Sequence, residues 1–303
     1  MNQFGYDQHG RLRSGFVIVF AIGIFFAAML AGMLLVILLD LLGISRALAV
    51  LAGGLLRIVL TFVLNNLLFR HAFKGQRFAA VDCFGFDGKR ALRLCLGLFF
   101  GIAFFLLTTI PLYLSGNYTL QWGNPGAGDV GILLLELLYF VGVGLAEELL
   151  ARGAILHALL RFGKWKALLI SSCVFGLLHL TNPNLDVLAM VNLILAGLIM
   201  GLSMYATGSI WVAIGFHITW NWIQGSVLGI PVSGHVQSGT LFQTAILGSN
   251  PVLTGGEFGA EASIICTAVL ALGSLAFFLY GRAKGNFALF EDRPLSLVKG
   301  QAK

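Results

Sequence analysis

The sequence predicts an all-α protein, a polytopic transmembrane helix bundle of about eight spans with both termini in the cytoplasm. Its 303 residues are 58% apolar or aromatic and only 11% charged, whereas a soluble domain carries roughly 25% charged residues. So few charges cannot cover the surface of a soluble protein of this length. The high apolar content also excludes a disordered chain. The sequence therefore predicts a single membrane domain over residues 1–303.

Eight apolar segments approach or exceed the roughly 20 residues that a helix needs to cross a bilayer core. The fifth is the shortest and ends at an Asn-Pro turn, and residues 230–260 are predicted to be an outer loop rather than a folded module. On the sixth segment, Gly197 and Gly201 form a small-xxx-small pair that favours close helix packing. The predicted spans are 15–42, 46–69, 95–115, 131–158, 166–181, 185–206, 209–229 and 262–281.

The basic residues predict the orientation of these spans. With the amino terminus in the cytoplasm, the inner segments hold 16 of the 19 Lys and Arg residues, and the outer loops hold only Arg46. This bias follows the positive-inside rule and predicts a multi-pass protein of the cell membrane. Since the net charge of +6 reflects topology, no binding of nucleic acid is expected. Arg57 and Arg152 are the exceptions, because they fall inside predicted spans.

The fourth span carries four ionisable residues that a lipid-facing helix would exclude. Each costs roughly 2.5 to 3.5 kcal/mol near the bilayer centre, so partners on other helices are expected. Glu148 and Arg152 are four residues apart and can pair along one helix face, as a structural pair or in support of a site. Glu147 is rotated about 100° from Glu148 and is left free for another role. Glu136 is expected to reach water at the outer interface.

Three more polar side chains fall at a similar depth on other spans. His179 lies near the end of the fifth span, and His217 and Asn221 lie one turn apart on the seventh. At a rise of about 1.5 Å per residue, Glu147 and these groups lie roughly 12–20 Å from the cytoplasmic ends of their helices. We therefore expect an acid, two imidazoles and an amide to share a pocket within the membrane.

Such a set of groups can activate water for attack on an amide carbonyl. Glu147 and His179 can hold and deprotonate the water, and His217 and Asn221 can donate hydrogen bonds to the developing oxyanion. Zinc is the alternative, with Glu147, His179 and His217 as its ligands, although the compact HExxH spacing is missing. Metal-free water activation and a zinc cofactor both stay open at this point.

The motifs around these residues resemble those of the CAAX prenyl endopeptidase and bacteriocin-processing (CPBP, or Abi) intramembrane proteases. The EExxxR, FxxxH and HxxxN motifs of that family occur in order as Glu147–Arg152, Phe175–His179 and His217–Asn221. They lie in a region of about residues 130–225, which we take as the catalytic core.

The resemblance implies an intramembrane endopeptidase, conventionally grouped with the metalloproteases. It implies that Glu147 activates water with His179 as its partner. It also implies that His217 and Asn221 stabilise the oxyanion, and that Glu148 and Arg152 support the site. The expected substrate is a peptide or lipid-anchored protein, as in CAAX-box protein maturation, reached among membrane lipids.

Two other functions fit the same composition. A proton-coupled transporter could use Glu147 and the histidines as a relay, although the inverted internal repeats typical of many transporters are not found in the sequence. A non-catalytic immunity or interaction protein could keep the fold and act by binding alone.

Overall fold

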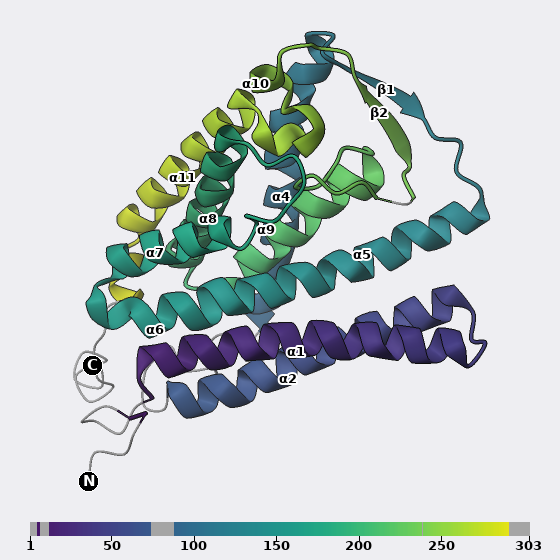
Figure 1. Cartoon of the computed structure of the whole chain (residues 1–303). Coiled ribbons are helices and arrows are strands. Elements are labelled where there is room, and N and C mark those ends of the chain that lie inside the picture. The colour runs from purple at the N-terminus through teal and green to yellow at the C-terminus, as the bar shows by residue number, and fades with distance from the viewer. Residues whose placement is uncertain (1–4, 7–11, 74–87, 238, 291–303) are drawn as a thin grey trace.

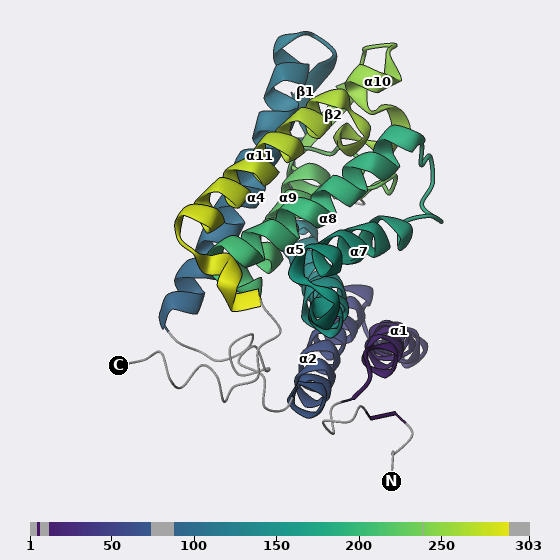
Figure 2. The ribbon, with the colours of Figure 1, turned by 90° about the vertical axis from the view of Figure 1, so that its left-hand side faces the viewer.

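The protein is a helical bundle, as predicted, in a computed structural model that describes residues 5, 6, 12–73, 88–237 and 239–290 (Figure 1). One group of helices runs side by side, and a second group is inclined to it, which Figure 2 shows with the first group seen nearly end-on. The first group is α1 (Ser14–Leu41), α2 (Arg46–Ala72) and α5 (Ala127–Glu148). The second is α4 (Gly88–Leu114), α8 (Val187–Thr207), α9 (Ile210–Trp222) and α11 (Ile264–Ala283), with α7 (Lys164–Leu177) beside α8.

Each of the eight predicted segments contains a helix. Within the described residues, six helical stretches are long and apolar enough to cross a membrane. The fifth and seventh predicted segments hold α7 and α9, of 14 and 13 residues, which fall short of that length. The number of spans and the cytoplasmic position of both termini therefore stay predictions. The expected inner segment around 74–87 and the ends 1–4, 7–11 and 291–303 lie outside the described residues.

Two helices continue as π-helices at a predicted motif: one π-helix contains Arg152 of the first motif, and the other begins two residues after Asn221 of the third. Behind Glu148, α5 continues as a π-helix over Leu149–Leu156, followed by α6 (His157–Leu159) and a short 3-10 turn. Behind α9, a second π-helix covers Ile223–Val227. The apolar pattern did not predict either widening. π-helical turns are rare in proteins, and those that occur are often found at functional sites. Both motifs therefore lie at an unusual backbone conformation.

The segment that follows α9 is structured, although the sequence predicts a plain outer loop. Its strand β2 (Phe242–Ile246) pairs antiparallel with β1 (Tyr118–Trp122), which lies between α4 and α5. A short helix, α10 (Pro251–Thr254), and two 3-10 turns lead to α11. Glu136 is buried beneath this segment and accepts a hydrogen bond from the Gly239 N–H at 3.3 Å. The expectation that Glu136 reaches water is therefore wrong, because the segment covers it.

Glycines let the site-bearing helices approach closely. A side chain at Gly97 or Gly101 of α4 would collide with the carbonyl groups of Val212 or Phe216 on α9. In addition, Thr219 of α9 donates a hydrogen bond to the Leu98 carbonyl at 2.7 Å. These backbone contacts fix the position of α9, the helix that carries His217 and Asn221.

The predicted small-residue pair on the sixth segment is confirmed as a packing feature. A side chain at Gly197 would meet the backbone of Ser172 on α7, and one at Gly201 would meet Leu168 on the same helix. Small residues at such an interface allow helix backbones to approach closely. This packing holds α7, which carries Phe175, against α8.

We expect Gly101→Val to destabilise the protein by about 1–3 kcal/mol, because the added methyl groups meet backbone that cannot move aside. The free energy of unfolding in mixed detergent micelles measures the effect. Gly23→Ala on α1 is the matched control, since a side chain there meets no other atom within 4 Å. Equal stability of Gly101→Val and the control would contradict the packing described for α4 and α9.

Candidate active site

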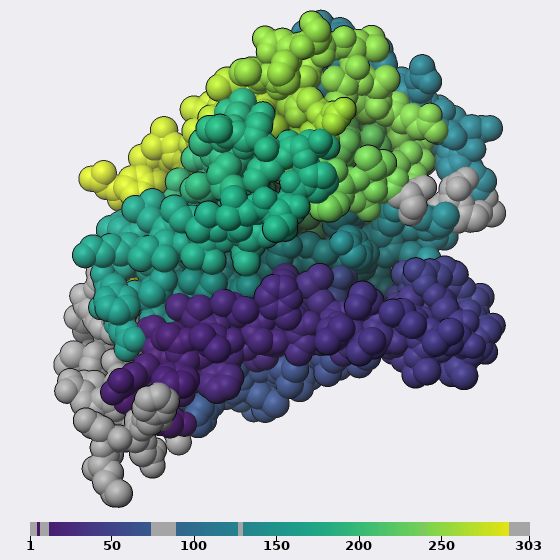
Figure 3. All heavy atoms as spheres, in the orientation of Figure 1, coloured from purple at the N-terminus to yellow at the C-terminus, as the bar shows by residue number. Residues whose placement is uncertain are grey.

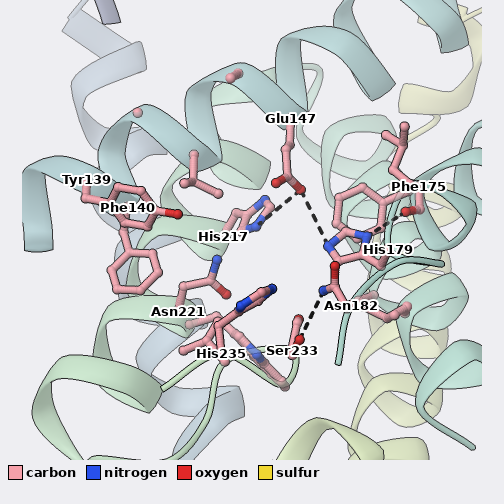
Figure 4. Close-up of a pocket in the computed structure, with 18 of the residues that line it drawn as sticks. Tyr139, Phe140, Glu147, Phe175, His179, Asn182, His217, Asn221, Ser233 and His235 are labelled. Carbon is pink, nitrogen blue, oxygen red and sulfur yellow. Dashed lines mark hydrogen bonds and ion pairs between the residues drawn. The ribbon is translucent and has the colours of Figure 1, made fainter. Parts of the chain in front are cut away.

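A pocket of about 410 Å³ lies inside the bundle, where α1, α2, α5, α7, α8, α9 and the segment after α9 meet. The space-filling view shows a hollow in the surface between α1 and the segments that follow α5 in the chain (Figure 3). Four predicted catalytic side chains line this pocket from two helices and a turn (Figure 4). They are Glu147 at the end of α5, His179 in the turn after α7, and His217 and Asn221 on α9.

Glu147 lies between the two imidazoles. Its Oε2 is 3.9 Å from Nε2 of His179 and 4.0 Å from Nε2 of His217. The same oxygen is buried and has no direct hydrogen-bond partner among the described residues. Distances slightly beyond a direct hydrogen bond are those at which a water can bridge two polar groups. The geometry therefore allows one water to contact the carboxylate and an imidazole at once.

The hydrogen bonds of the two histidines set their tautomers. Nδ1 of His179 faces the Phe175 carbonyl at 2.9 Å, and Nδ1 of His217 faces Glu148 Oε1 at 3.1 Å. Both neighbours are acceptors, so both Nδ1 atoms carry the proton. In the neutral rings each Nε2 then presents a lone pair to the pocket. Each imidazole can accept a hydrogen bond from water or take up a proton there.

The predicted pair of Glu148 and Arg152 is present behind the pocket. Arg152 Nη1 donates to Glu148 Oε1 at 2.8 Å, and both side chains are fully buried. Nη2 of Arg152 also donates to the Gly197 carbonyl at 2.7 Å. Glu148 thus connects the guanidinium to the His217 ring. Through Glu148, the buried charge of Arg152 on the π-helix fixes the orientation of the His217 imidazole in the pocket.

Phe175 packs among the charged groups of this network. Its ring lies under the Arg152 guanidinium at 4.6 Å and contacts the rings of His179 and His217 at centroid distances of 5.1 and 5.8 Å. A cation over an aromatic face is attracted to it. Phe175 is the first residue of the FxxxH motif, and its ring packs against both imidazoles of the pocket.

The segment after α9 closes the pocket with residues that sequence reasoning missed. Glu261 accepts hydrogen bonds from the indole N–H of Trp220 at 3.0 Å and from the backbone N–H and hydroxyl of Ser233 at 2.6 and 2.8 Å. The Asn182 amide donates to the Ser233 carbonyl at 3.0 Å. His235 lies across the pocket from Glu147 (Figure 4). Their sequence signal was weak, because Ser233 and His235 lie in the predicted outer loop and Glu261 directly follows it.

Arg57 also lines the pocket, from the middle of α2. Its Nη2 donates to the Tyr139 carbonyl at 2.9 Å, and its guanidinium lies 4.9 Å from the centre of the Tyr139 ring. The sequence did give a signal here, since a charge inside a predicted span marks a functional candidate.

The donor atoms in the pocket are spaced more widely than the ligands of a zinc ion. Glu147, His179 and His217 offer the right donor atoms, but zinc ligands at about 2.0–2.2 Å in a tetrahedron lie about 3.3–3.6 Å from one another. The observed separations of 3.9 and 4.0 Å are wider. Among the described residues, no group of three or more His, Cys, Asp or Glu side chains is arranged to hold a metal ion. The spacing of these three residues therefore does not fit zinc.

The fold and the pocket define a polytopic helical membrane protein with an acid and two imidazoles buried inside the bundle. Residues 129–223 match the family of type II CAAX prenyl endopeptidases described as Rce1-like. This match confirms the resemblance to the CAAX proteases and assigns the segment a fold of that type. It covers all three motifs and leaves α1, α2, α4 and α11 outside it. No curated protein and no solved structure matches the chain.

Proposed function

We propose that the protein is an intramembrane endopeptidase that hydrolyses a peptide bond by direct attack of water. The observation that carries this proposal is the position of Glu147 Oε2, within 4.0 Å of two imidazole nitrogens in a pocket inside the bundle. The match of residues 129–223 to the CAAX prenyl endopeptidases supports the same reaction.

Water activation uses Glu147 and His179. A water between them can direct one hydrogen to Glu147 Oε2 and the other to the free Nε2 of His179, which leaves an oxygen lone pair for the substrate carbonyl. As the C–O bond forms, Glu147 takes up the proton and acts as the general base. Glu147 then returns this proton to the leaving amine as the C–N bond breaks. The reaction gives a carboxylic acid and an amine, with no covalent intermediate.

Stabilisation of the oxyanion uses His217 and Asn221, whose side chains lie one helical turn apart in the pocket. The Asn221 amide can donate a hydrogen bond without any change of protonation. His217 can donate from Nε2 only when both ring nitrogens are protonated, since Nδ1 already donates to Glu148. Glu148 holds the His217 ring in this orientation through the hydrogen bond that it accepts at 3.1 Å. Glu148 and Arg152 therefore support catalysis through His217.

The proposed substrate is a peptide or lipid-anchored protein that enters the pocket from the membrane. Apolar side chains of α1 form part of the wall, among them Phe25, Phe26 and Met29. A lipid chain attached to the substrate can pack against such a wall. We place the reaction in the cell membrane, with the pocket in the cytoplasmic half of the bilayer, as the distribution of basic residues predicts.

A comparison of membrane peptides from cells with the wild-type protein and with Glu147→Ala tests this function. We expect at least one peptide or protein terminus to depend on the wild-type protein. Identical peptide pools with a lost phenotype would point to a proton-coupled transporter, and identical pools with an intact phenotype would point to an immunity or interaction protein.

Removal of metal ions should leave cleavage unchanged, because the proposed mechanism uses only side chains and water. Purified protein is dialysed against EDTA and then against buffer, and its cleavage rate and zinc content are measured together. A loss of activity that returns on addition of zinc would contradict the proposed mechanism and restore the zinc interpretation.

A further inference from the structure

Arg57 is a cation inside the membrane whose hydrogen-bonding capacity is largely unused. It lies eleven residues after the first residue of α2 and fifteen before the last. Its Nη2 binds the Tyr139 carbonyl, whereas its Nε is buried and has no partner among the described residues. Within this part of the chain, no carboxylate lies within 4.0 Å of it, and the nearest charge that acts on it is that of Glu147. A half-buried guanidinium with one direct hydrogen bond keeps donors for a ligand, and charged residues inside a membrane mark binding sites and pathways.

The neighbouring helix leaves room for this guanidinium. Opposite Arg57, α5 has a glycine, Gly142, and a side chain there would lie 2.5 to 3.0 Å from the guanidinium atoms. The charged head therefore occupies the space of a missing side chain, beside the Tyr139 ring. Gly142 and Tyr139 of α5 thus form a recess that holds the Arg57 guanidinium and opens into the pocket of Glu147.

A second, apolar cavity of about 430 Å³ meets the first one at Arg57 and Tyr139. It lies between α1, α2 and α5, and its other lining residues are apolar or glycine. Arg57 is therefore the charged residue at the junction of two cavities. An anion that reaches this junction can form charge-assisted hydrogen bonds with the guanidinium, beside the apolar walls of the second cavity.

The position of Arg57 indicates the source of that anion. At about 1.5 Å per residue, Arg57 lies roughly 16 and 22 Å from the ends of α2, too deep for lipid phosphates at the membrane surface. Gly142 precedes Glu147 by five residues, or about 7.5 Å along α5. An extended peptide advances about 3.3 Å per residue. A peptide whose terminal carboxylate binds Arg57 would thus place a bond two or three residues from its end beside Glu147.

We propose that Arg57 binds the C-terminal carboxylate of the peptide substrate and so selects the bond that is cleaved. This inference rests on the proposed function for the identity of the ligand. Arg57 is a specificity-determining residue in this account, and its five N–H donors suit the planar carboxylate in a paired contact. It lies outside residues 129–223, which match the protease family.

Binding to full-length Glu147→Gln protein tests the proposal without any need for cleavage. The probes are three fluorescent peptides with an S-farnesylated cysteine followed by three residues. One ends in aliphatic residues with a free carboxylate, one is its carboxamide, and one is a carboxamide with glutamate as the last residue. We expect the free acid to bind roughly 10- to 100-fold more tightly than the carboxamide. Arg57→Gln should abolish this preference and leave binding of the carboxamide within about twofold.

Arg46→Gln is the matched control, because Arg46 lies on the same helix, is exposed and pairs with Asp40. It should keep the preference for the free acid, and Arg57→Lys should keep part of it if Arg57→Gln does not fold. Equal affinities for acid and carboxamide with Arg57 intact, or no binding of the free acid, would overturn the proposal. Equal binding of the glutamate-ended carboxamide and the free acid would overturn the assignment to the chain terminus.

Cleavage by protein with Glu147 intact separates this proposal from the proposed function. If Arg57 only supports the charge of Glu147, Arg57→Gln lowers kcat/KM equally for the acid and the carboxamide, which would contradict carboxylate recognition. If the wild-type protein cleaves neither peptide but keeps the Arg57-dependent preference in binding, the proposed function fails and the carboxylate site stands.

Discussion

Replacing Glu147 by glutamine is expected to lower peptide cleavage by about a hundred- to ten-thousandfold. Glutamine keeps the size of the side chain but cannot take a proton from water, and loss of a general base has an effect of that order. Glu147 Oε2 has no direct hydrogen-bond partner among the described residues. The substitution therefore removes little structural stabilisation, and the melting temperature should stay close to that of the wild type.

The measurement is the rate of product formation by purified protein in proteoliposomes, with the melting temperature recorded on the same samples. Glu257→Gln is the matched control, since Glu257 is exposed and lies outside the pocket. The control should cleave at the wild-type rate. A Glu147→Gln protein that retains more than a tenth of the wild-type rate would contradict the role of Glu147 as the base.

Replacing Arg152 by alanine is expected to destabilise the protein by about 3–5 kcal/mol. The substitution leaves Glu148 buried without its guanidinium partner, and an uncompensated buried charge has a cost of this order. It also removes the donor to the Gly197 carbonyl, which joins the π-helix to α8. The free energy of unfolding in mixed detergent micelles measures the loss.

Two comparisons separate the buried pair from a general effect of losing an arginine. Arg46→Ala breaks the exposed pair with Asp40 and should cost less than about 1 kcal/mol. The double variant Glu148→Ala, Arg152→Ala should be more stable than Arg152→Ala alone, because no unpaired charge remains. If Arg152→Ala is no less stable than Arg46→Ala, the result would contradict the stabilising role of the buried pair of Glu148 and Arg152.

The sequence predicted the helices and the four proposed catalytic residues because their signals are local. Apolar length identifies a membrane helix, and Glu147, His179 and His217 stand out as polar residues at similar depth. The pair of Glu148 and Arg152 follows from a spacing of four residues along one helix. These features depend on one helix at a time, so they can be read without the tertiary structure.

The rest of the pocket could not be predicted because it depends on contacts between distant segments. Glu261 reaches Ser233 and Trp220 only after the chain folds back over α9. The orientation of His217 depends on Glu148, 69 residues earlier. Arg57 was visible as a charge inside a span, but only the gap at Gly142 shows that it faces the pocket. Tertiary packing therefore decides which of the intramembrane charges meet.

A single-turnover reaction in water enriched in oxygen-18 tests most directly whether Glu147 activates water. With enzyme in excess over peptide, we predict one heavy oxygen in the new carboxylate of essentially every product molecule and no label in Glu147. Label in the Glu147 side chain, with unlabelled oxygen in part of the product, would show that Glu147 attacks the carbonyl itself and would contradict direct attack by water.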